Sequence, residues 1–381
     1  MAKLRDRERQ PSATSRSEKR PKGMAGDIQI KQFELQEREA LLSFLREAYA
    51  EDPRKSDPDY WQWHYLENPH TSPEDVPLWI VKDGEKIVGQ TATLPVELKL
   101  GEATTRAIWI LDFIVNAEYR GKGLGKRLVA AARDACPTMF ALGFNEQSER
   151  VLRSLKWVMM GRISRYHRLL FPGEALGELS TFGPVRGALN LGYAPFRPRA
   201  KASTGRVKLR EVTSFDDSFD ALWEEASRQW PCAVVRRAKF LEWQFMRQPG
   251  KRFDVLGLYE RDELLGYVVL FFRKPESAGG SPPKAAISDL FYRQDAHLDV
   301  IEELLQGALR LALERRAGSL VIDVLDPRVE ARLRRMGFWQ IKNSPQFMTY
   351  SPDRGDLMYD MSHWFLTRAD SDVSIFEQPN L

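Results

Sequence analysis

The sequence predicts an α/β fold that occurs twice along the chain. Between residues 107 and 135, a strand, a glycine-rich loop and a helix follow one another. A pattern of aromatic and acidic residues in the first half returns about 180 residues later. With 381 residues, the chain is also longer than one ordinary domain, which favours two.

The stretch from Ala107 to Val115 is apolar except for Asp112 and is rich in Ile, Val, Trp and Phe. This composition predicts a central strand that is covered on both faces. After a short polar turn come three glycines at alternating positions, and then apolar residues with helical spacing (Leu124, Leu128, Val129, Ala132 and Ala135).

A glycine loop between a strand and a helix can bind phosphate. The first backbone N–H groups of a helix have no intrahelical partner and lie at the positive end of the helix dipole. Gly121, Gly123 and Gly125 allow close approach of the backbone and positive φ angles. Arg120 and Lys126 add positive charge at the same end. A glycine-rich turn that binds no ligand is the alternative.

Two common phosphate motifs do not fit this loop. A Walker A loop requires Gly-Lys followed by Ser or Thr, but Arg127 follows Lys126. The dinucleotide fingerprint Gly-x-Gly-x-x-Gly fails because its third glycine is missing. The pattern that is present is Arg-x-x-Gly-x-Gly, from Arg120 to Gly125.

This pattern, between its strand and helix, resembles the acyl-CoA pyrophosphate loop of the GNAT-type N-acetyltransferase superfamily. The resemblance implies a mixed sheet and acetyl-CoA as the acyl donor, with its pantetheine beside the central strand. It assigns the following residues to the cofactor: Phe113, Ile114, Val115, Arg120, Gly121, Lys122, Gly123, Leu124, Gly125, Lys126 and Asn145. One position departs from the family, because Leu152 stands where a tyrosine commonly protonates the departing thiolate.

The second half repeats the first without the phosphate loop. Trp63, Tyr65 and Pro69 return as Trp243, Phe245 and Pro249, each 180 residues later, and Asp112 matches Asp289 at an offset of 177. The residues after Asp289 contain no glycine before the next helix, expected from about 299 to 316, and they include Asp295 and Asp299. Acidic side chains there would repel a pyrophosphate, so we expect two GNAT-like domains of which the second lacks the phosphate loop.

These observations divide the chain into five segments. The first is a basic arm, 1–26. Its first 22 residues contain eight Lys and Arg but three Asp and Glu. Because the net charge of the whole chain is +4, the net charge of the remainder is close to zero. The composition of the arm predicts disorder, either as a solvated tail or as a weak tether to nucleic acid or anionic lipid. We expect an acyl-CoA-binding domain at 27–171, a Pro- and Gly-containing linker at 172–206, a degenerate domain at 207–370 and a tail at 371–381.

The other candidate sites are weaker. Cys136 and Cys232 lie in no disulfide or zinc pattern, and His64 and His70 are expected in one surface loop without a third metal ligand. We therefore expect no metal. The aromatic clusters near Trp63 and Trp243 indicate core packing, with a base-stacking platform as the alternative, and specific nucleic-acid binding is not expected. The chain has no apolar run long enough to span a membrane and no apolar signal core, so a cytoplasmic location is expected.

The predicted function is transfer of an acetyl group from acetyl-CoA to an amine of a small molecule or amino sugar. Asp112 is the only ionisable residue of the central strand, so it is the candidate base, or else a structural aspartate. The tandem form and the Trp364–Thr367 segment resemble proteins of bacterial polysaccharide pathways. Two alternatives remain: a non-catalytic acyl-CoA-binding or interaction protein, which Leu152 favours, and a Fem-type aminoacyl transferase. We also expect the second half to supply the acceptor side of the site. The sequence does not predict the oligomeric state.

Overall fold

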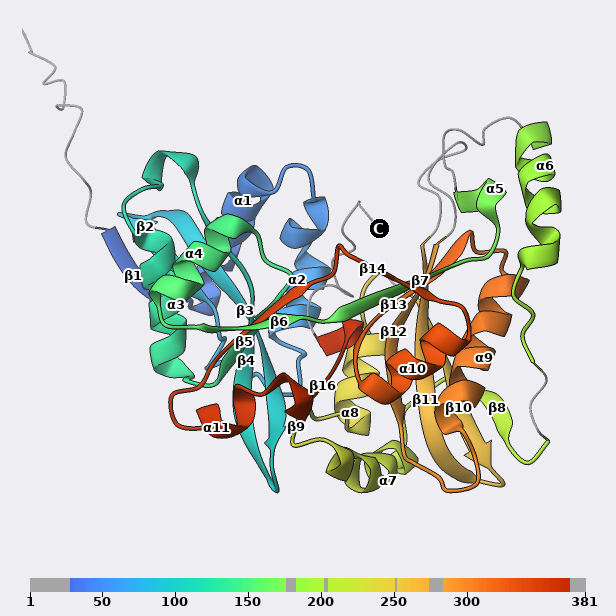
Figure 1. Ribbon diagram of the computed structural model, residues 1–381. Coiled ribbons are helices and arrows are strands. Elements are labelled where there is room, and N and C mark those ends of the chain that lie inside the picture. The colour runs from blue at the N-terminus through green and yellow to red at the C-terminus, as the bar shows by residue number, and fades with distance from the viewer. Residues whose placement is uncertain (1–27, 176–182, 202–204, 251, 274–283, 371–381) are drawn as a thin grey trace, which may run out of the picture.

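The protein is described here from a computed structural model that covers residues 28–175, 183–201, 205–250, 252–273 and 284–370. The predicted basic arm and C-terminal tail lie outside these residues. Two lobes stand side by side, one for each half of the chain, and their strands join in a single sheet of 16 strands (Figure 1). The predicted α/β fold class with a mixed sheet is confirmed.

The first half forms the left lobe of Figure 1. Its elements are β1 (Ile28–Gln32), η1 (Leu35–Glu37), α1 (Arg38–Ala48), η2 (Pro53–Ser56), α2 (Pro58–Tyr65), β2 (Trp79–Asp83), β3 (Lys86–Leu100), β4 (Ala103–Val115), η3 (Ala117–Tyr119), α3 (Leu124–Ala135), β5 (Met139–Leu142), α4 (Glu146–Ser154), β6 (Val158–Arg162) and β7 (Ser164–Leu169).

The connector and the second half follow. The connector holds α5 (Pro172–Ala175), α6 (Gly183–Tyr193) and η5 (Ala194–Phe196), so the segment that we expected to be a linker contains an 11-residue helix. The second half contains β8 (Lys208–Val212), α7 (Asp217–Ala226), η6 (Ser227–Gln229), β9 (Cys232–Val234), α8 (Ala238–Leu241), η7 (Glu242–Met246), β10 (Phe253–Glu260), β11 (Glu263–Arg273), β12 (Lys284–Tyr292), α9 (Val300–Glu314), β13 (Ser319–Leu325), α10 (Pro327–Arg335), β14 (Trp339–Ile341), β15 (Gln346–Tyr350), α11 (Gly355–Met358), η8 (Met361–His363), β16 (Trp364–Thr367) and η9 (Arg368–Asp370).

The two halves exchange strands. β7 leaves the first half and pairs antiparallel with β13 over its whole length, from Ser164 opposite Val324 to Leu169 opposite Ser319. In return, β15 enters the first half and pairs with both β5 and β6. The two long crossing strands are visible between the lobes in Figure 1. The sheet of each half is therefore completed by a strand of the other half.

Two tryptophans mark the pseudo-twofold relation between the halves. The rings of Trp63 and Trp243 stack with centroids 4.7 Å apart and an interplanar angle of 13°. Each indole Nε1–H donates to the other residue's backbone carbonyl at 2.9 Å. Both side chains are buried in a cluster that draws residues from both halves. Core packing, as predicted for these aromatic residues, is confirmed.

The central strand, the helix after the glycine loop and the helix from about residue 299 lie where the sequence pattern predicts them, but α2 was not predicted. Residues 58–65 follow a two-proline loop and were not expected to be helical, whereas the structure has a helix there. The carboxylate of Asp57 caps this helix by accepting from the backbone N–H groups of Asp59 and Tyr60, and Pro58 fills the first position, where no donor is needed. The prediction that His64 lies in a surface loop is therefore wrong, because His64 is buried on α2.

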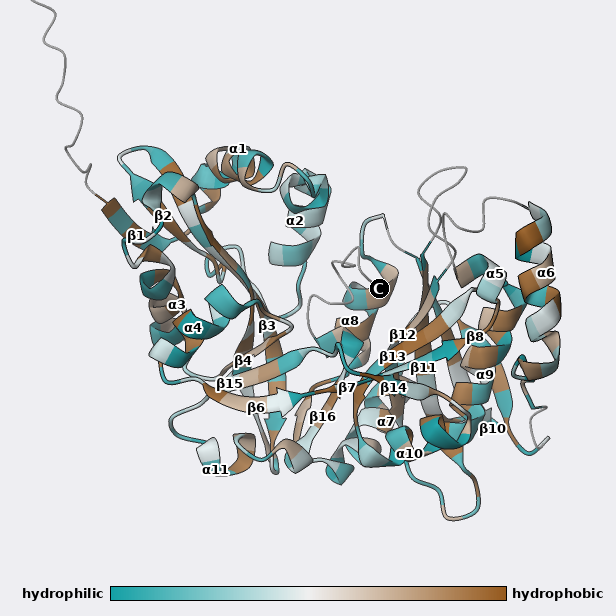
Figure 2. Ribbon diagram, turned by 45° about the horizontal axis from the view of Figure 1, so that its top comes forward, coloured by the Kyte–Doolittle hydropathy of each residue, from teal (hydrophilic) through white to brown (hydrophobic). Residues whose placement is uncertain are grey.

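The helices cover the sheet of the first half from two sides. α3 packs its apolar stripe of Leu128, Val129 and Ala132 against β2, β3 and β4. Residues of α1 and α2 form a separate cluster with Ala92 of β3 and Ile114 of β4. Apolar residues accordingly concentrate on the strands, while polar residues dominate the outer helix faces (Figure 2). The sheet around β4 is thus covered by α3 on one face and by α1 and α2 on the other.

Candidate functional site

The central strand β4 has a free edge in its C-terminal part. It pairs with β5 at Ile108 and Trp109 alone, and among the described residues no other strand continues this edge from Ile110 to Val115. A β-bulge leaves Leu111 without a partner on β3, because Ala92 pairs with Asp112 and Thr93 pairs with Ile110. The expectation of a strand buried on both faces holds for residues 107–110 but not for 111–115, which are half-buried. A gap therefore opens between β4 and β5 at the bulge.

The glycine loop lies at the end of this gap. Gly123 is the N-cap of α3 with φ 73°, and Gly121 has φ 78°, so both positions require glycine for their backbone conformation. The first intrahelical bond runs from the N–H of Arg127 to the carbonyl of Gly123, at 3.1 Å. The preceding N–H groups lie at the start of the helix, where an anion is stabilised.

The charged side chains of the loop are exposed, and two of them have partners within the protein. The Nε of Arg120 donates to the carbonyl of Val115 at 3.2 Å. The Lys122 ammonium lies over the Tyr119 ring, 4.9 Å from its centroid. Leu124 is buried beneath the loop, and Lys126 is exposed on the first turn of α3. The loop thus combines backbone donors with three cationic side chains.

Two further positions named by the resemblance lie on α4. Asn145 caps this helix, since its side-chain oxygen accepts from the N–H of Ser148 at 2.9 Å. Leu152 is buried in the cluster between α3 and the sheet. Position 152 therefore offers no proton donor to a thiolate.

Two side chains on the face of the sheet opposite α3 hold Asp112. The ammonium of Lys55 lies 2.6 Å from its Oδ2, and the hydroxyl of Tyr49 donates to the same oxygen. Both partners come from the α1–η2 region, so Asp112 faces α1 and α2 rather than α3. The ion pair is partly accessible, with the side chains of Lys55 and Asp112 exposed by 20% and 26%.

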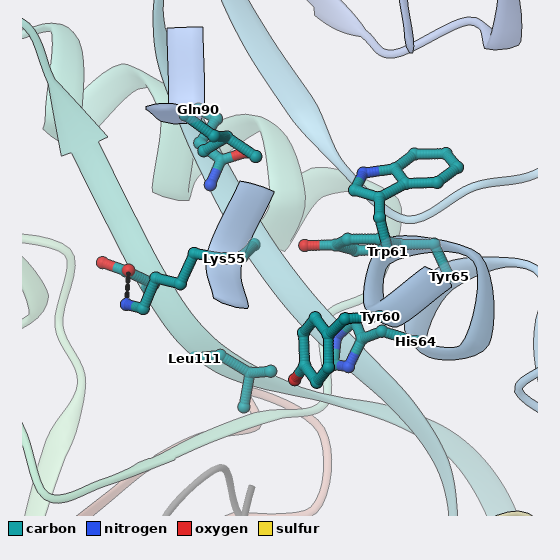
Figure 3. A pocket seen from close by; sticks show the side chains of 10 residues that line it. Lys55, Tyr60, Trp61, His64, Tyr65, Gln90 and Leu111 are labelled. Carbon is teal, nitrogen blue, oxygen red and sulfur yellow. Dashed lines mark hydrogen bonds and ion pairs between the residues drawn. The ribbon is translucent and has the colours of Figure 1, made fainter. Parts of the chain in front are cut away.

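A small pocket lies beside this ion pair (Figure 3). Its volume is about 30 Å³. Its lining comes entirely from the first half and comprises Leu45, Lys55, Tyr60, Trp61, His64, Tyr65, Gln90, Ala92, Leu111 and Asp112. The lining includes the bulge at Leu111, where the gap between β4 and β5 begins. The sequence pointed to Asp112 but missed Lys55, His64 and Gln90, because the helix that carries His64 was not predicted.

His64 and Gln90 are the buried polar residues of this pocket. His64 is 2% exposed, and burial lowers its pKa to about 4, so the imidazole is neutral near pH 7. Burial, and then the nearby Asp112 carboxylate, raise the pKa of Tyr65. Within the described part of the chain, Nδ1 of His64 and Oε1 of Gln90 have no hydrogen-bond partner. Buried polar atoms are normally satisfied, so this pair needs an explanation.

The matching region of the second half is filled by the chain itself. Asp289 follows a bulge on β12 as Asp112 does on β4, and accepts from Arg236, from Tyr267 and from the Thr367 hydroxyl. β16 and η9 lie against β12 and β13 where those strands diverge. The side-chain amide of Gln244, which matches His64, donates to the carbonyl of Ala369 at 2.6 Å. Among the residues that the structure describes, the chain itself therefore occupies the place that is open beside β4.

The N-terminus of α9 also differs from the N-terminus of α3. Asp299 caps α9 by accepting from the N–H of Glu302 and also pairs with Arg332 at 2.6 Å. The helix terminus that would hold a pyrophosphate is therefore occupied by a carboxylate.

The described residues bear on two other functions, membrane insertion and metal binding. No helix among them has the length and apolar character to cross a bilayer. The same residues contain no group of three or more His, Cys, Asp or Glu arranged to hold a metal ion.

Known proteins share parts of this sequence and most of this fold. Residues 42–155 match the model of the Acetyltransferase (GNAT) family. The N-myristoyltransferase of Saccharomyces cerevisiae with bound myristoyl-CoA is 12% identical, with 90% of this chain and 87% of that chain covered at a TM-score of 0.58. A GCN5-related N-acetyltransferase from Anabaena variabilis is 13% identical, with 84% and 72% covered at 0.56.

A probable N-acyltransferase from Enterococcus faecalis is 14% identical, with 84% of this chain and 72% of that chain covered at a TM-score of 0.57. At such identities these likenesses show the fold alone. No curated protein matches the sequence. The family match spans α2, the central strand, the glycine loop and α3, which are the elements that build the site. Residues 42–155 therefore resemble the acetyltransferase domain of the GNAT family, within a two-lobed fold that is similar to the folds of other N-acyltransferases.

Proposed function

We propose that this protein transfers an acetyl group from acetyl-CoA to the amine of a small molecule or amino sugar. The observation that carries the proposal is the course of the free edge of β4. It begins at the bulge beside the polar pocket and ends near the glycine loop, so a bound acyl-CoA would have its pyrophosphate at α3 and its thioester near Leu111. In this arrangement Phe113, Ile114 and Val115 offer their backbone to the pantetheine.

A short acyl group fits the pocket at the end of this path. The pocket of about 30 Å³ is far below the ~300–1,000 Å³ of sites that enclose drug-sized ligands. A long acyl chain would require a larger apolar cavity. Acetyl-CoA is therefore the preferred donor.

The reaction needs no covalent enzyme intermediate. The amine lone pair attacks the thioester carbonyl, an N–C bond forms, the C–S bond breaks, and the proton lost by nitrogen ends on the thiol of CoA. With Leu152 in place of an acid, water is left to protonate the thiolate. Asp112 cannot act as a free base while it pairs with Lys55 and Tyr49, so we assign it the role of fixing Lys55 at the pocket.

The second half positions the site rather than lining it. Every residue of the pocket belongs to the first half, so the expected contribution of the second half to the acceptor side does not extend to this pocket. Trp243 does hold α2 through ring stacking and two hydrogen bonds to and from Trp63, the neighbour of His64. We propose that the second half fixes α2 in this way. A role in polysaccharide metabolism rests on the resemblance of the sequence alone.

Two other functions remain as alternatives. A non-catalytic acyl-CoA-binding protein would bind acetyl-CoA and release no thiol with any amine. A Fem-type aminoacyl transferase would use an aminoacyl ester as its donor and show no affinity for acetyl-CoA. Calorimetric titration with acetyl-CoA, followed by measurement of thiol release with a panel of amines, separates the three.

The loop variant Gly123→Glu tests where the donor binds. It places bulk and negative charge at the start of α3, so we expect acetyl-CoA affinity to fall about 100-fold or more. Gly123→Ala is the matched control for strain at φ 73°, and Ala296→Glu places the same charge in the exposed loop of the second half. Both controls should bind far better than Gly123→Glu. Wild-type affinity of a folded Gly123→Glu protein would show that the donor binds elsewhere.

A further inference from the structure

The connector helix α6 presents its apolar side to solvent, which reverses the usual arrangement of a surface helix. Positions 186, 190 and 193 form one row along the helix and hold Arg, Asn and Tyr, whereas the neighbouring rows hold Val185, Leu189 and Leu191. Among the described residues, four of the seven exposed large hydrophobic side chains lie between 185 and 196, namely Val185, Leu189, Leu191 and Phe196. Single exposed apolar residues are ordinary, but a group of them on one helix and the turn after it marks an interaction surface.

The polar row attaches α6 to the rest of the protein. The side-chain oxygen of Asn190 accepts from the N–H of Gly173 on α5 at 2.9 Å, and the guanidinium of Arg186 lies 3.5 Å from a carboxylate oxygen of the same short helix. The hydroxyl of Tyr193 donates to the carbonyl of Leu169 at 3.2 Å. Within α6, Asn190 and Tyr193 are half-buried and the other residues are exposed. Polar contacts therefore fix the orientation of the helix with its apolar side outward.

The position of α6 makes this apolar side accessible to a large partner. The helix stands at the outer edge of the right lobe in Figure 1, and Figure 2 shows hydrophobic residues on it. Among the described elements, α6 packs on α5 and continues into η5. The side chains of Leu191 and Phe196 remain 76% and 72% exposed.

The charge of the same segment has one sign. Residues 183–201 contain no Asp or Glu and four cationic residues, which are Arg186, Arg197, Arg199 and Lys201. Phe196 and Arg199 are three residues apart, so their Cα atoms lie within about 11 Å of each other. Exposed apolar side chains with cations close by are typical of surfaces that bind anionic lipid.

A hollow of about 370 Å³ beside the connector adds to this positive charge. Arg199 and Lys201 line it together with Arg168 of β7 and Arg335 of α10, and its lining contains a single carboxylate, that of Glu302. The ammonium of Lys201 lies 3.1 Å from this carboxylate, so the hollow keeps an excess of positive charge. Phosphate groups at a membrane surface would complement it.

Two other occupants of the apolar side fit these observations less well. In a twofold dimer the same patch meets its own copy, so the cations of two connectors would face each other. A stable protein interface takes roughly 20–30 residues a side, whereas the apolar group here consists of four side chains on one helix and one turn. A bilayer surface needs no such area, because a few apolar side chains that enter the headgroup region act together with cations at the lipid phosphates.

We propose that α6 and η5 form a membrane-docking surface, which inserts its four apolar side chains into an anionic bilayer while Arg199 and Lys201 bind lipid phosphates. With 11 residues, α6 is shorter than the ~20 residues that span a bilayer, so it lies in the plane of the surface. The inference is independent of the proposed acyl transfer. It places the protein at a membrane surface whichever amine it acylates.

Co-sedimentation of the full chain with vesicles tests this surface. Vesicles of phosphatidylcholine are compared with vesicles of equal parts phosphatidylcholine and phosphatidylglycerol, at low and at physiological salt. We expect the partition coefficient to be at least about tenfold higher for the anionic vesicles at low salt, with a smaller difference when salt is added. Absence of binding by the folded protein, or equal binding to both compositions, would overturn the inference.

The double variant Leu191→Ser with Phe196→Ser separates α6 from the other basic segments of the chain. Residues 1–22 are present in every variant, so a change in binding belongs to the connector. We expect the partition coefficient for anionic vesicles to fall at least about tenfold. The melting temperature should stay unchanged, because both side chains are exposed. Leu35→Ser is the matched control, since Leu35 is exposed on η1 of the other lobe, and it should bind like wild type.

Two results of this comparison would contradict the inference. Wild-type vesicle binding by the folded double variant would assign the binding to another segment. A change from dimer to monomer in sedimentation velocity, with vesicle binding unaltered, would show that a second copy covers α6. The charge variant Arg199→Glu completes the test, because it should weaken binding to anionic vesicles about tenfold or more while binding to phosphatidylcholine vesicles stays as it was.

Discussion

Asp112 and Asp289 occupy matching positions in the two halves, each directly after a bulge in a central strand, yet their surroundings differ. Asp112 pairs with Lys55 beside a pocket and a gap in the sheet. Asp289 is 1% exposed and pairs with Arg236, which also donates to Asp370 of the C-terminal turn at 2.7 Å. The same strand geometry therefore serves a site in one half and a sealed ion network in the other.

The comparison shows how a duplicated fold can lose a site without losing stability. In the second half, residues 364–370 fill the space between diverging strands and supply donors and acceptors to the buried groups. In the first half, His64 and Gln90 keep unsatisfied atoms at the matching place. Where a central strand keeps its bulge, either a ligand or a segment of the same chain is needed to fill the space beside the strand. The predictions below test this contrast, starting with the largest expected effect.

A chain that ends at Leu170 should fail to fold. It lacks β15, which pairs with β5 and β6, and it lacks Trp243, which packs on Trp63. The loss leaves strand edges and apolar core exposed, so we expect aggregation or loss of cooperative unfolding. Circular dichroism during heating and size-exclusion chromatography provide the measurement.

The matched control for this fragment is the same fragment mixed with residues 171–381, which restores the missing strand. A fragment that unfolds cooperatively by itself and binds acetyl-CoA like the full chain would show that the exchanged strands are dispensable. In that case each half would be an independent domain.

The buried arginine of the second half should matter more for stability than the lysine at the pocket. Arg236→Leu leaves the carboxylates of Asp289 and Asp370 without compensation, and removing one partner of a buried ion pair costs about 3–5 kcal/mol. Lys55→Met should cost about 1 kcal/mol or less, because water reaches Asp112. Urea unfolding of the two variants measures the difference. Equal losses would contradict the contrast between a sealed and an open site.

The sequence predicted the fold well because its strongest signals are local or repeated. The glycine loop and the helix after it lie where they were predicted, and the Trp63–Trp243 repeat predicted two related halves. The strand exchange was not predictable in the same way. β7 and β15 were not predicted as strands, and no local pattern in their residues shows which sheet edge each one joins.

The pocket was missed for a related reason. His64 was expected in a surface loop, whereas it lies on α2, a helix that Asp57 caps and whose first position Pro58 fills. Without that helix, His64 could not be placed next to Gln90 and Lys55, which lie on other elements. Tertiary proximity of residues that are far apart in sequence carries no periodic signal.

His64 should make the protein less stable in mild acid. Burial lowers its pKa from 6.5 to about 4, so between these values the unfolded chain binds more protons and the free energy of unfolding falls with falling pH. This term lowers stability by about 2 kcal/mol from pH 7 to pH 5. Asp370, whose pKa burial raises to about 6, contributes with the opposite sign. The test is therefore the difference between wild type and His64→Leu.

Urea unfolding of both proteins at pH 7 and pH 5 gives this difference. The stability of His64→Leu relative to wild type should improve by about 2 kcal/mol at the lower pH. Contributions of Asp370 and the remaining histidines cancel in the comparison. An unchanged difference between the two pH values would mean that His64 is protonated or accessible in the folded protein.

Removing residues from the two ends of the chain should affect the stability of the protein differently. Near the C-terminus, Trp364, Phe365 and Leu366 are buried, and the segment joins β9 and β13, so its removal would open the core. Residues 1–24 are rich in Lys, Arg and Ser and have no large apolar residue besides Met1, Leu4 and Met24, which gives them little to bury. Their deletion should leave the melting temperature and kcat/KM unchanged within error. Measurements at low and at physiological salt add sensitivity, because a basic segment that docks on the folded protein would stabilise it more at low ionic strength. A fall in melting temperature that grows as salt is removed would show such docking, and the arm would then belong to the folded unit.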